Sequence, residues 1–395
     1  MNTQVLVTGG AGFIGSHLVD ALIERGYRVR VLDNLEPQVH GNLRERGSRP
    51  AYLHHEAELI VADLQDAAAV RGALDGVEVV FHEAAMVGVG QSMYEITRYI
   101  SSNDLGAAVL LQAIVEMKKH PRKIITASSM SIYGEGAYNC PEHGVVYPRL
   151  RPAQQLQRRQ WDMRCPVDGC AQTVLPAPTN EDKPLHPTSV YAITKRDHEE
   201  LFLSVGRAYE IPAVALRYFN TYGPRQALSN PYTGVAAIFS ARLLEGKAPT
   251  IYEDGQQLRD FTHVSDIVQA NLLVMEHKEA ADAVYNVASG QALTILQVAE
   301  TLINAMQQAG LLRQEQLQQV QPEITGLFRA GDIRHCVSEL ARLKALGYQP
   351  HTLFEDGAAA LVDWVRVQRT GAKLTGENAA FQKAQQELEQ RGLAR

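Results

Sequence analysis

The chain has few of the features that mark secreted, membrane-embedded or nucleic-acid-binding proteins. Four of its 395 residues are cysteine, too few and too unevenly placed for the disulfide framework of a secreted protein. Its 38 Lys and Arg against 44 Asp and Glu give a net charge of -6, so the basic surface that binds DNA or RNA is lacking. No long apolar run and no N-terminal signal pattern is present, which predicts a cytoplasmic protein without a membrane span.

What the sequence does have, from residue 4 to about residue 135, is an alternation of short β-branched runs with amphipathic helical stretches. This alternation is typical of a parallel sheet covered by helices, and it predicts an α/β fold of the doubly wound, Rossmann type. The predicted strands are residues 4–8, 28–33, 58–62, 77–82, 123–128 and 212–218, and the longest predicted helix is 189–207.

A glycine-rich turn, Gly9-Gly10-Ala11-Gly12-Phe13-Ile14-Gly15, joins the first predicted strand to a helix. Residues without a β-carbon let the backbone approach a phosphate, and the helix N-terminus offers free amide donors there. Asp33 ends the second strand, where a carboxylate can accept both ribose hydroxyls of an adenosine and would repel a phosphate. The pattern predicts NAD rather than NADP, although Arg30 lies nearby in sequence. The alternative is a turn without a ligand.

Tyr191 and Lys195 are four residues apart in the predicted helix 189–207, so both side chains lie on one face. A neighbouring ammonium lowers the pKa of a phenol, and Tyr191 could then take a proton from a substrate hydroxyl. Ser129 follows the strand 123–128, at the edge where open α/β sheets bind ligands, and would hydrogen-bond the reacting oxygen. Alone, this Tyr-Lys spacing is usually an ordinary helix face; with the glycine turn and the serine it predicts a catalytic trio.

These residues resemble the extended short-chain dehydrogenase/reductases, specifically the NAD-dependent sugar-nucleotide epimerase and dehydratase family. The resemblance covers residues 1 to about 350 outside the segment 137–182. Its segments occur in the family's order: TGGAGFIGSH from Thr8, Asp63-Leu64, His82-Glu83-Ala84-Ala85, Asn103 with Gly106, Ser128-Ser129 through Tyr133-Gly134, Tyr191 with Lys195, Arg217-Tyr218-Phe219-Asn220, Gly223-Pro224-Arg225, Arg259-Asp260-Phe261 through Asp266, and Arg329-Ala330-Gly331-Asp332.

The resemblance, together with the glycine turn, implies contacts for a cofactor and a substrate. NAD would contact Gly9, Gly12, Phe13, Ile14, Gly15, Asp33, Asn34, Asp63, Leu64, Ala84, Ala85, Asn103, Tyr191, Lys195 and Tyr218. A nucleotide sugar would contact Ser129, Met130, Asn220, Arg225, Arg259, Arg329, Asp332 and Cys336. Arginines suit a diphosphate, although each one singly could equally be a surface ion-pair partner.

Members of this family begin with hydride transfer from sugar C4 to NAD and differ in the later steps. Dehydratases carry an acidic pair just after the catalytic hydroxyl residue, and decarboxylating members a glutamate two residues on; here Met130 and Ser131 occupy these positions. The resemblance therefore implies a 4-epimerase of a UDP- or dTDP-linked hexose or deoxyhexose, such as dTDP-L-rhamnose, which retains its NAD. The alternatives are a 4,6-dehydratase, a 4-ketosugar reductase and a non-catalytic NAD-binding scaffold. A homodimer is expected by resemblance only.

Two further positions bear on the substrate pocket by resemblance. Cys336 occupies the place of a gatekeeping side chain, where a small residue accompanies tolerance of bulkier sugars; a buried structural cysteine is the alternative. Val87 stands where the family's epimerases often have a lysine, which puts one contact on the nicotinamide side in doubt.

The segment 137–182 separates Ser129 from Tyr191 and is interpreted as an insertion rich in Pro, Arg and Gln. It holds four residues that could close a tetrahedral structural zinc site, namely Cys140, His143, Cys165 and Cys170. Asp168 competes with Cys170 as the fourth ligand, and the alternative is a lid loop with incidental thiols.

We therefore expect three regions. Residues 1–217 form the NAD-binding domain with the insertion 137–182, residues 218–350 are mainly a substrate-binding lobe, and residues 351–395 are a C-terminal helix and tail. From Thr370 onward the sequence lacks a strong apolar face, which predicts a frayed helix or disorder.

Overall fold

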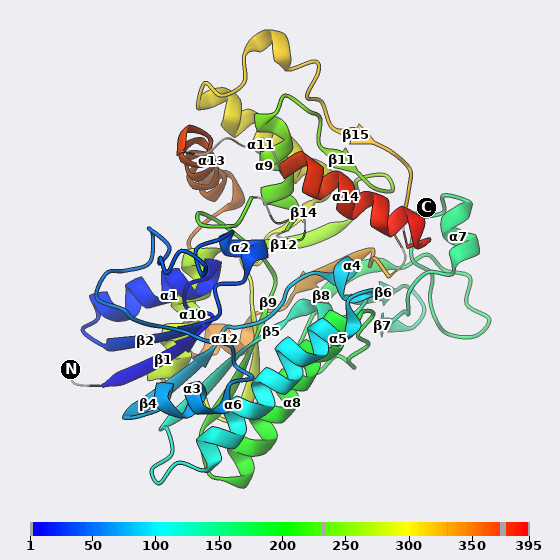
Figure 1. Cartoon of the computed structure of the whole chain (residues 1–395). Coiled ribbons are helices and arrows are strands. Elements are labelled where there is room, and N and C mark those ends of the chain that lie inside the picture. The colour runs from blue at the N-terminus through cyan, green and yellow to red at the C-terminus, as the bar shows by residue number, and fades with distance from the viewer. Residues whose placement is uncertain are drawn as a thin grey trace.

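A computed structural model describes residues 3–371 and 377–393, apart from 229, 231, 233 and 330. Its centre is a parallel seven-stranded sheet in the order β13-β9-β5-β4-β1-β2-β3, in the lower part of Figure 1. The strands are β1 (Gln4–Thr8), β2 (Arg28–Asp33), β3 (Glu58–Val61), β4 (Val77–His82), β5 (Lys123–Ser129), β9 (Ala213–Tyr218) and β13 (Ala283–Val287). The predicted fold class is confirmed, and each predicted strand ends within one residue of an observed one.

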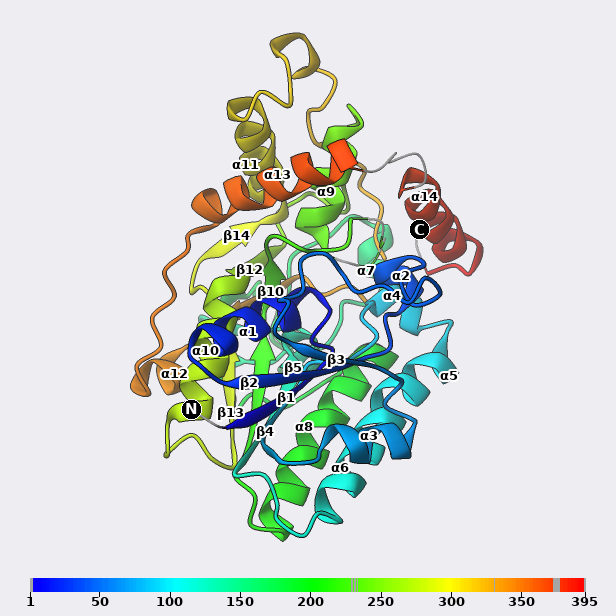
Figure 2. The same cartoon turned by 60° about the vertical axis from the view of Figure 1, so that its left-hand side comes forward.

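Helices cover both faces of this sheet, so its strands are apolar on both sides. In β1, Val5 and Val7 belong to one core and Leu6 between them to the other, as alternating side chains require. Figure 2 shows the two helical layers. One contains α1 (Phe13–Glu24), α10 (Val264–Glu276) and α12 (Ala341–Ala345), and the other α3 (Ala67–Ala73), α6 (Gly106–Val115) and α8 (Val190–Ala208).

The strand β13 crosses the domain division expected from the sequence. It lies within residues 218–350, expected to be mainly a substrate lobe, yet it pairs in parallel with β9 and forms the edge of the main sheet. The helix α10 comes from the same range and packs against α1. The chain thus leaves the first domain and later returns to it. On its return, Tyr285 and Val287 of β13 complete the apolar core of that domain.

A second sheet and a helical lobe lie above the first sheet (Figure 1). The second sheet has the order β10-β12-β16-β8-β6-β7, with β14 paired to β12. The lobe has its own core between three helices, to which Phe354, Leu361 and Val365 contribute. The elements outside the insertion are β10 (Asn220–Tyr222), β12 (Leu258–His263), β14 (Ala292–Thr294), β16 (His335–Ser338), α9 (Val235–Leu244), α11 (Ile295–Gln308), α13 (Phe354–Gly371), and the pair β11 (Thr250–Ile251) and β15 (Glu323–Ile324).

The insertion 137–182 is built into this second sheet. It contains β6 (Ala137–Cys140), β7 (Gly144–Val146), α7 (Ala153–Gln157) and β8 (Leu175–Thr179). Strand β8 pairs with β6 on one side and with β16 on the other. The inserted residues therefore continue the sheet that carries the C-terminal part of the substrate lobe.

The remaining elements are short, apart from a C-terminal helix. They are α2 (Pro37–His40), α4 (Val89–Ser92), α5 (Ile96–Tyr99), the π-helix η1 (Ile100–Leu105), and the 3-10 turns η2 (Met130–Tyr133) and η3 (Gln314–Gln316). Within the described ranges, none of the helices has the length and hydropathy of a membrane span.

Of the two expectations for this stretch, a frayed helix or disorder, the structure has a helix, α14 (Glu377–Gln390), while residues 372–376 lie outside the described part. Leu388 packs over Gly90, and Glu387 accepts a hydrogen bond from the Tyr94 hydroxyl at 2.8 Å. These tertiary contacts hold a helix whose own sequence pattern is weak.

Candidate active site

The glycine turn between β1 and α1 is so compact that two of its positions leave no room for a side chain. Gly9 has a φ of +68°, and a β-carbon there would lie 2.7 Å from the backbone of Ala84. A β-carbon on Gly15 would collide with the carbonyl oxygen of Gly9. Helix α1 begins with Gly12 as its N-cap, without a side-chain cap and without an acid in the first turn. Its positive end is thus available to an anion.

Asp33 stands at the end of β2 with its carboxylate held towards this turn. It is 8% exposed and accepts hydrogen bonds from the amides of Ala11 (3.0 Å) and Leu35 (2.9 Å). Burial raises the pKa of Asp33, and His40 opposes that rise. Arg30, the residue that left NADP open, instead donates to Glu58 at 2.9 Å and to backbone carbonyls. The geometry therefore agrees with an NAD site.

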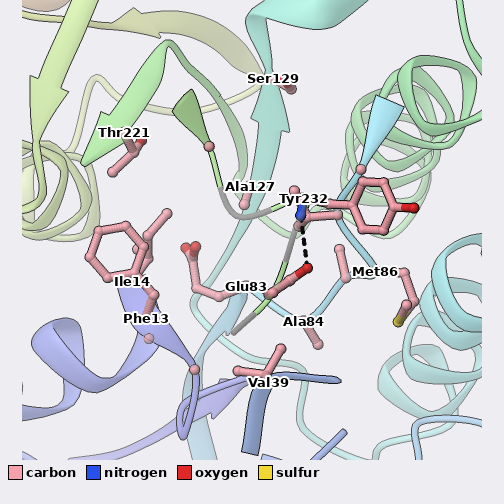
Figure 3. Close-up of a pocket in the computed structure, with 18 of the residues that line it drawn as sticks. Phe13, Ile14, Val39, Glu83, Ala84, Met86, Ala127, Ser129, Thr221 and Tyr232 are labelled. Atoms are coloured by element: carbon pink, nitrogen blue, oxygen red, sulfur yellow. Dashed lines mark hydrogen bonds between the residues drawn. The ribbon is translucent and has the colours of Figure 1, made fainter. Parts of the chain in front are cut away.

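One cavity of about 490 Å³ joins the glycine turn to the carboxyl ends of β4, β5 and β9. Figure 3 shows side chains around it from the glycine turn (Phe13), from the residue after β4 (Glu83), from β5 (Ala127) and from β10 (Thr221). Most predicted site residues line it: Gly9, Gly12, Phe13, Ile14, Gly15, Asp33, Asn34, Asp63, Leu64, Ala84, Ala85, Ser129, Met130, Tyr191, Lys195, Tyr218 and Asn220.

The predicted catalytic residues Ser129, Tyr191 and Lys195 meet in this cavity. Tyr191 lies in the first turn of α8, which Ser189 caps by accepting a hydrogen bond from the amide of Ala192 at 3.1 Å. Burial raises the pKa of Tyr191 to about 12, and a hydrogen bond with Ser129 opposes the rise. Burial is thus the dominant effect on this pKa, and the lowering expected from Lys195 stays a prediction.

Lys195 lines the cavity one helical turn after Tyr191 and donates to the carbonyl oxygen of Ala127 at 2.8 Å. Burial lowers the pKa of Lys195 to about 8, while the carboxylates of Glu83 and Asp104 oppose that shift. The hydrogen bond to the strand β5 therefore fixes the position of the ammonium relative to the phenol.

Glu83 is a cavity residue that sequence reasoning missed. The Tyr218 hydroxyl donates to it at 2.8 Å, and Asn271 donates to that hydroxyl at 2.7 Å. Burial raises the pKa of Glu83 to about 7, against the effects of Tyr218 and Lys195. The signal that could have found it is an acidic residue directly after the apolar strand β4, inside the motif His82-Glu83-Ala84-Ala85.

Asn103 lies behind the cavity wall rather than in it. Its side chain accepts from the amide of Met86 at 2.8 Å and donates to the Thr194 hydroxyl at 2.9 Å. Asn103 ties the cavity loop after β4 to helix α8, and its contact with a cofactor stays a prediction.

Two predicted substrate arginines, Arg259 and Arg225, are engaged elsewhere and do not line the cavity. The guanidinium of Arg259 donates to the carbonyls of Ile333 (2.7 Å) and Arg334 (3.0 Å). That of Arg225 pairs with Asp20 of α1 at 2.7 Å. The structure does not bring these two side chains together as a diphosphate clamp.

Arg329, Asp332 and Cys336 also lie outside the cavity lining. Arg329 pairs with Asp332 at 2.8 Å and stacks over the ring of Tyr252 at 4.6 Å. Cys336 of β16 is 1% exposed within an apolar core, and burial raises the pKa of its thiol to about 12. Its surroundings favour the structural alternative for this cysteine. Val87, by contrast, lines the cavity and is 47% exposed.

The four predicted metal ligands Cys140, His143, Cys165 and Cys170 come together in the insertion. Their sulfur and nitrogen atoms all lie within 4.8 Å of one another. Asp168, the competing fourth ligand, is not a member of this group. Although Cys140 and Cys170 are 30 residues apart in the chain, the fold brings their sulfur atoms to 3.9 Å.

The glycine turn, the buried carboxylate at the end of β2 and the Ser-Tyr-Lys trio define a dinucleotide-dependent enzyme with a Rossmann fold. The NAD dependent epimerase/dehydratase family matches residues 5–153 and 169–288. The chain belongs to that family, which confirms the resemblance seen in the sequence.

Individual relatives are similar over nearly their whole length. A dTDP-L-rhamnose 4-epimerase from Burkholderia thailandensis is 37% identical over 365 residues, which is 92% of this chain and 94% of the relative. The solved UDP-glucose 4-epimerase of Thermotoga maritima with UDP-glucose is 30% identical with a TM-score of 0.71, covering 93% of this chain and 100% of its own. That of Thermus thermophilus in complex with NAD is 30% identical with a TM-score of 0.70, covering 94% and 100%.

Proposed function

We propose that the chain is an NAD-dependent 4-epimerase of a UDP- or dTDP-linked hexose or deoxyhexose. The observation that carries this proposal is that Ser129, Tyr191 and Lys195 line the same cavity as the glycine turn. Among substrates, a dTDP-linked 6-deoxyhexose such as dTDP-L-rhamnose is favoured by the 37% identical relative. A cytoplasmic location is part of the proposal, since a reducing compartment keeps the four free thiols reduced.

The cavity fits NAD on the evidence of its own residues. The glycine turn and the uncapped N-terminus of α1 would hold the pyrophosphate, since Gly9 and Gly15 have no room for a β-carbon. Asp33 would hold the adenosine ribose, and Asp63 and Leu64 would flank the adenine. Bound NAD supplies an acceptor, and then a donor, of the hydride at sugar C4.

The side chains of the trio handle the proton and the oxygen. As a phenolate, Tyr191 would take the proton of the sugar C4 hydroxyl and return it after the sugar has presented its other face. The positive charges of Lys195 and of a bound oxidised dinucleotide would favour that phenolate against the effect of burial, which raises the pKa to about 12. The Ser129 hydroxyl holds the same oxygen, and the hydrogen bond from Ser131 at 2.9 Å fixes the orientation of Ser129. Lys195 is protonated below its pKa of about 8 and provides positive charge one turn along α8.

The chemistry of the alternatives finds less support. A 4,6-dehydratase needs an acid and a base beside the catalytic hydroxyl, but the buried Met130 and the hydroxyl of Ser131 stand there. The cavity carboxyl Glu83 is bound to Tyr218 on the β4 side. A 4-ketosugar reductase consumes reduced cofactor, so a reaction that proceeds without added cofactor separates it from an epimerase.

The test is to incubate the purified chain with UDP- and dTDP-sugars, dTDP-L-rhamnose included, without added NAD, and to resolve the products by NMR. We expect a C4 stereoisomer of one of these sugars. Tyr191→Phe should slow its formation by about 10²- to 10⁴-fold. Tyr209→Phe, which changes an exposed tyrosine at the end of the same helix, should leave the rate unchanged. A dehydrated keto sugar, or no turnover of any sugar, would refute the proposal.

We also propose a homodimer formed by the helices α5, η1 and α8, which pack side by side. Apolar side chains are exposed along them, namely Ile96, Ile100, Leu105 and Ile193. Contiguous exposed apolar groups favour association. Light scattering after gel filtration should give twice the 43.5 kDa chain mass, and Ile193→Asp should shift it towards one chain.

Finally, we propose that Cys140, His143, Cys165 and Cys170 bind one structural zinc ion that takes no part in the epimerisation. Support comes from the donor set, since three thiolates and an imidazole are a common closed zinc site.

A further inference from the structure

Three of the six distances among the four ligand atoms of the insertion match the edges of a tetrahedron around one ion, and all six are within 4.8 Å. With Zn–S bonds of about 2.3 Å and Zn–N bonds of about 2.0 Å, a tetrahedral site has S···S edges of about 3.8 Å and S···N edges of about 3.5 Å. The structure has 3.9 Å between the sulfurs of Cys140 and Cys170. It has 3.5 Å from His143 Nδ1 to Cys140 and 3.7 Å to Cys165. Cross-linked thiols would lie much closer together.

The insertion has little else to hold it together. Its own apolar cluster is small, consisting of Tyr138, Val146, Met163 and Val174 beside the cysteines. A segment with so little core depends on a cross-link or a metal for a fixed shape. The family pattern leaves residues 154–168 unmatched, and Cys165 lies in that stretch.

The shape of the insertion matters because it reaches the substrate lobe through strand pairing. In Figure 1 the segment containing β6 and β7 lies on the right of the molecule, beside β8. Strand β6, which ends at Cys140, pairs with β8, and β8 pairs with β16 through Thr179 and Ser338. Strand β16 then pairs with β12 through Cys336 and Arg259.

A second link is a buried ion pair between Arg151 of the insertion and Glu253 of the lobe. Both hydrogen bonds of this pair are 2.8 Å, and the two side chains are 1% and 3% exposed. Glu253 also accepts from Arg334 at 3.1 Å, and Arg334 directly precedes β16. The insertion is thus joined to Arg334 and β16 both by strand pairing and by a charge network.

We infer that the zinc site is a positioning device: by fixing the insertion it holds β16 and, through the pairing of β16 with β12, the side of the cavity to which Phe261 of β12 belongs. The NAD side is independent, since β1, β2 and the glycine turn have no strand pairing with the second sheet within the described residues. The expected consequence of metal loss is weaker binding of the nucleotide sugar with NAD retained. This consequence for catalysis rests on the proposed function, whereas metal binding and the rigidity of β16 do not.

The experiment compares the full chain with Cys165→Ala, Cys170→Ala and the matched control Asp168→Asn. Elemental analysis should find one zinc per chain in the native protein and in Asp168→Asn, and none in the two cysteine variants. Hydrogen exchange should rise in β6, β8 and β16 of the zinc-free variants and stay unchanged in β1 and β2. Because a cysteine variant could misfold, the native protein is also stripped with a chelator and reloaded with zinc, which should restore the protection.

With an active substrate in hand, zinc removal should raise KM for the nucleotide sugar by about tenfold and leave the NAD content unchanged. Absence of zinc in the native chain, another metal in its place, or a disulfide between Cys140 and Cys170 overturns the metal site. Increased exchange confined to residues 140–175, with β16 unchanged, overturns the positioning role. Failure of every sugar to react leaves the zinc and exchange results standing, so it refutes the proposed function alone.

Discussion

Replacing Glu253 by glutamine should destabilise the chain more than replacing Arg151 by methionine, although both changes break the same ion pair. The side chains of Arg151, Glu253 and Arg334 are each at most 3% exposed, so none of their charges can turn to water. Removing one partner of such a buried pair costs about 3–5 kcal/mol, mostly through the unpaired charge that remains.

Which of the two variants loses more stability depends on which charged groups each substitution leaves unpaired. In Arg151→Met, Glu253 keeps its bond from Arg334 at 3.1 Å, so we expect a loss near the lower end, about 3 kcal/mol. In Glu253→Gln, the amide oxygen can accept only one of the two bonds from Arg151, and the remaining acceptors of Arg151 are the backbone carbonyls of Trp161 at 3.2 Å and Asp332 at 3.4 Å. A buried guanidinium without a carboxylate should cost about 5 kcal/mol.

Denaturant unfolding followed by tryptophan fluorescence measures this difference. Trp161 lies in the insertion and Trp364 in α13, so a Trp364→Phe background makes the signal report the insertion. The control is Glu200→Gln, which breaks the exposed pair with Arg196 and should cost less than about 0.5 kcal/mol. Equal losses in the two buried variants, or losses as small as the control's, would refute the reasoning.

Three further predictions concern the cavity. Tyr191→Phe should lower kcat by about 10²- to 10⁴-fold with little change in KM, as expected for loss of a proton-transfer group, in an NMR-based rate assay. Gly15→Ala should yield chain purified without nucleotide, because the added methyl group meets the Gly9 carbonyl; chromatography of the nucleotide released on denaturation shows this, and full NAD content would contradict it. Glu83→Gln should change the free energy of unfolding, relative to the native chain, more favourably at pH 8 than at pH 5. The difference between the two pH values should be at most about 3 kcal/mol. Burial raises the pKa of Glu83 from 4.5 to about 7, so its contribution to stability is complete below pH 4.5 and is lost as the pH rises through 7; unfolding curves at the two pH values test this, and an equal difference at both would contradict it.

Much of the fold and the cofactor half of the site could be predicted from the sequence, because the signals are local. Strands β1 and β2, the glycine turn and Asp33 lie within the first 33 residues, where hydrophobic period and glycine placement report the backbone directly. Tyr191 and Lys195 are one helical turn apart, so their common face follows from helix geometry. The four candidate metal ligands, Cys140, His143, Cys165 and Cys170, could likewise be predicted from their spacing in the sequence.

The tertiary structure decided what depends on segments distant in the chain. The place of β13 in the main sheet is set by pairing with β9, which its own short sequence does not reveal. The selection of Cys170 over Asp168 is likewise set by how the insertion folds back on itself. Tertiary packing also raises the pKa of Tyr191 by burying the phenol, and it brings the guanidinium of Arg259 to backbone carbonyls. Sequence spacing specifies which groups can act, but burial and non-local packing determine which charges are solvated, which partners are in reach, and hence what each group does.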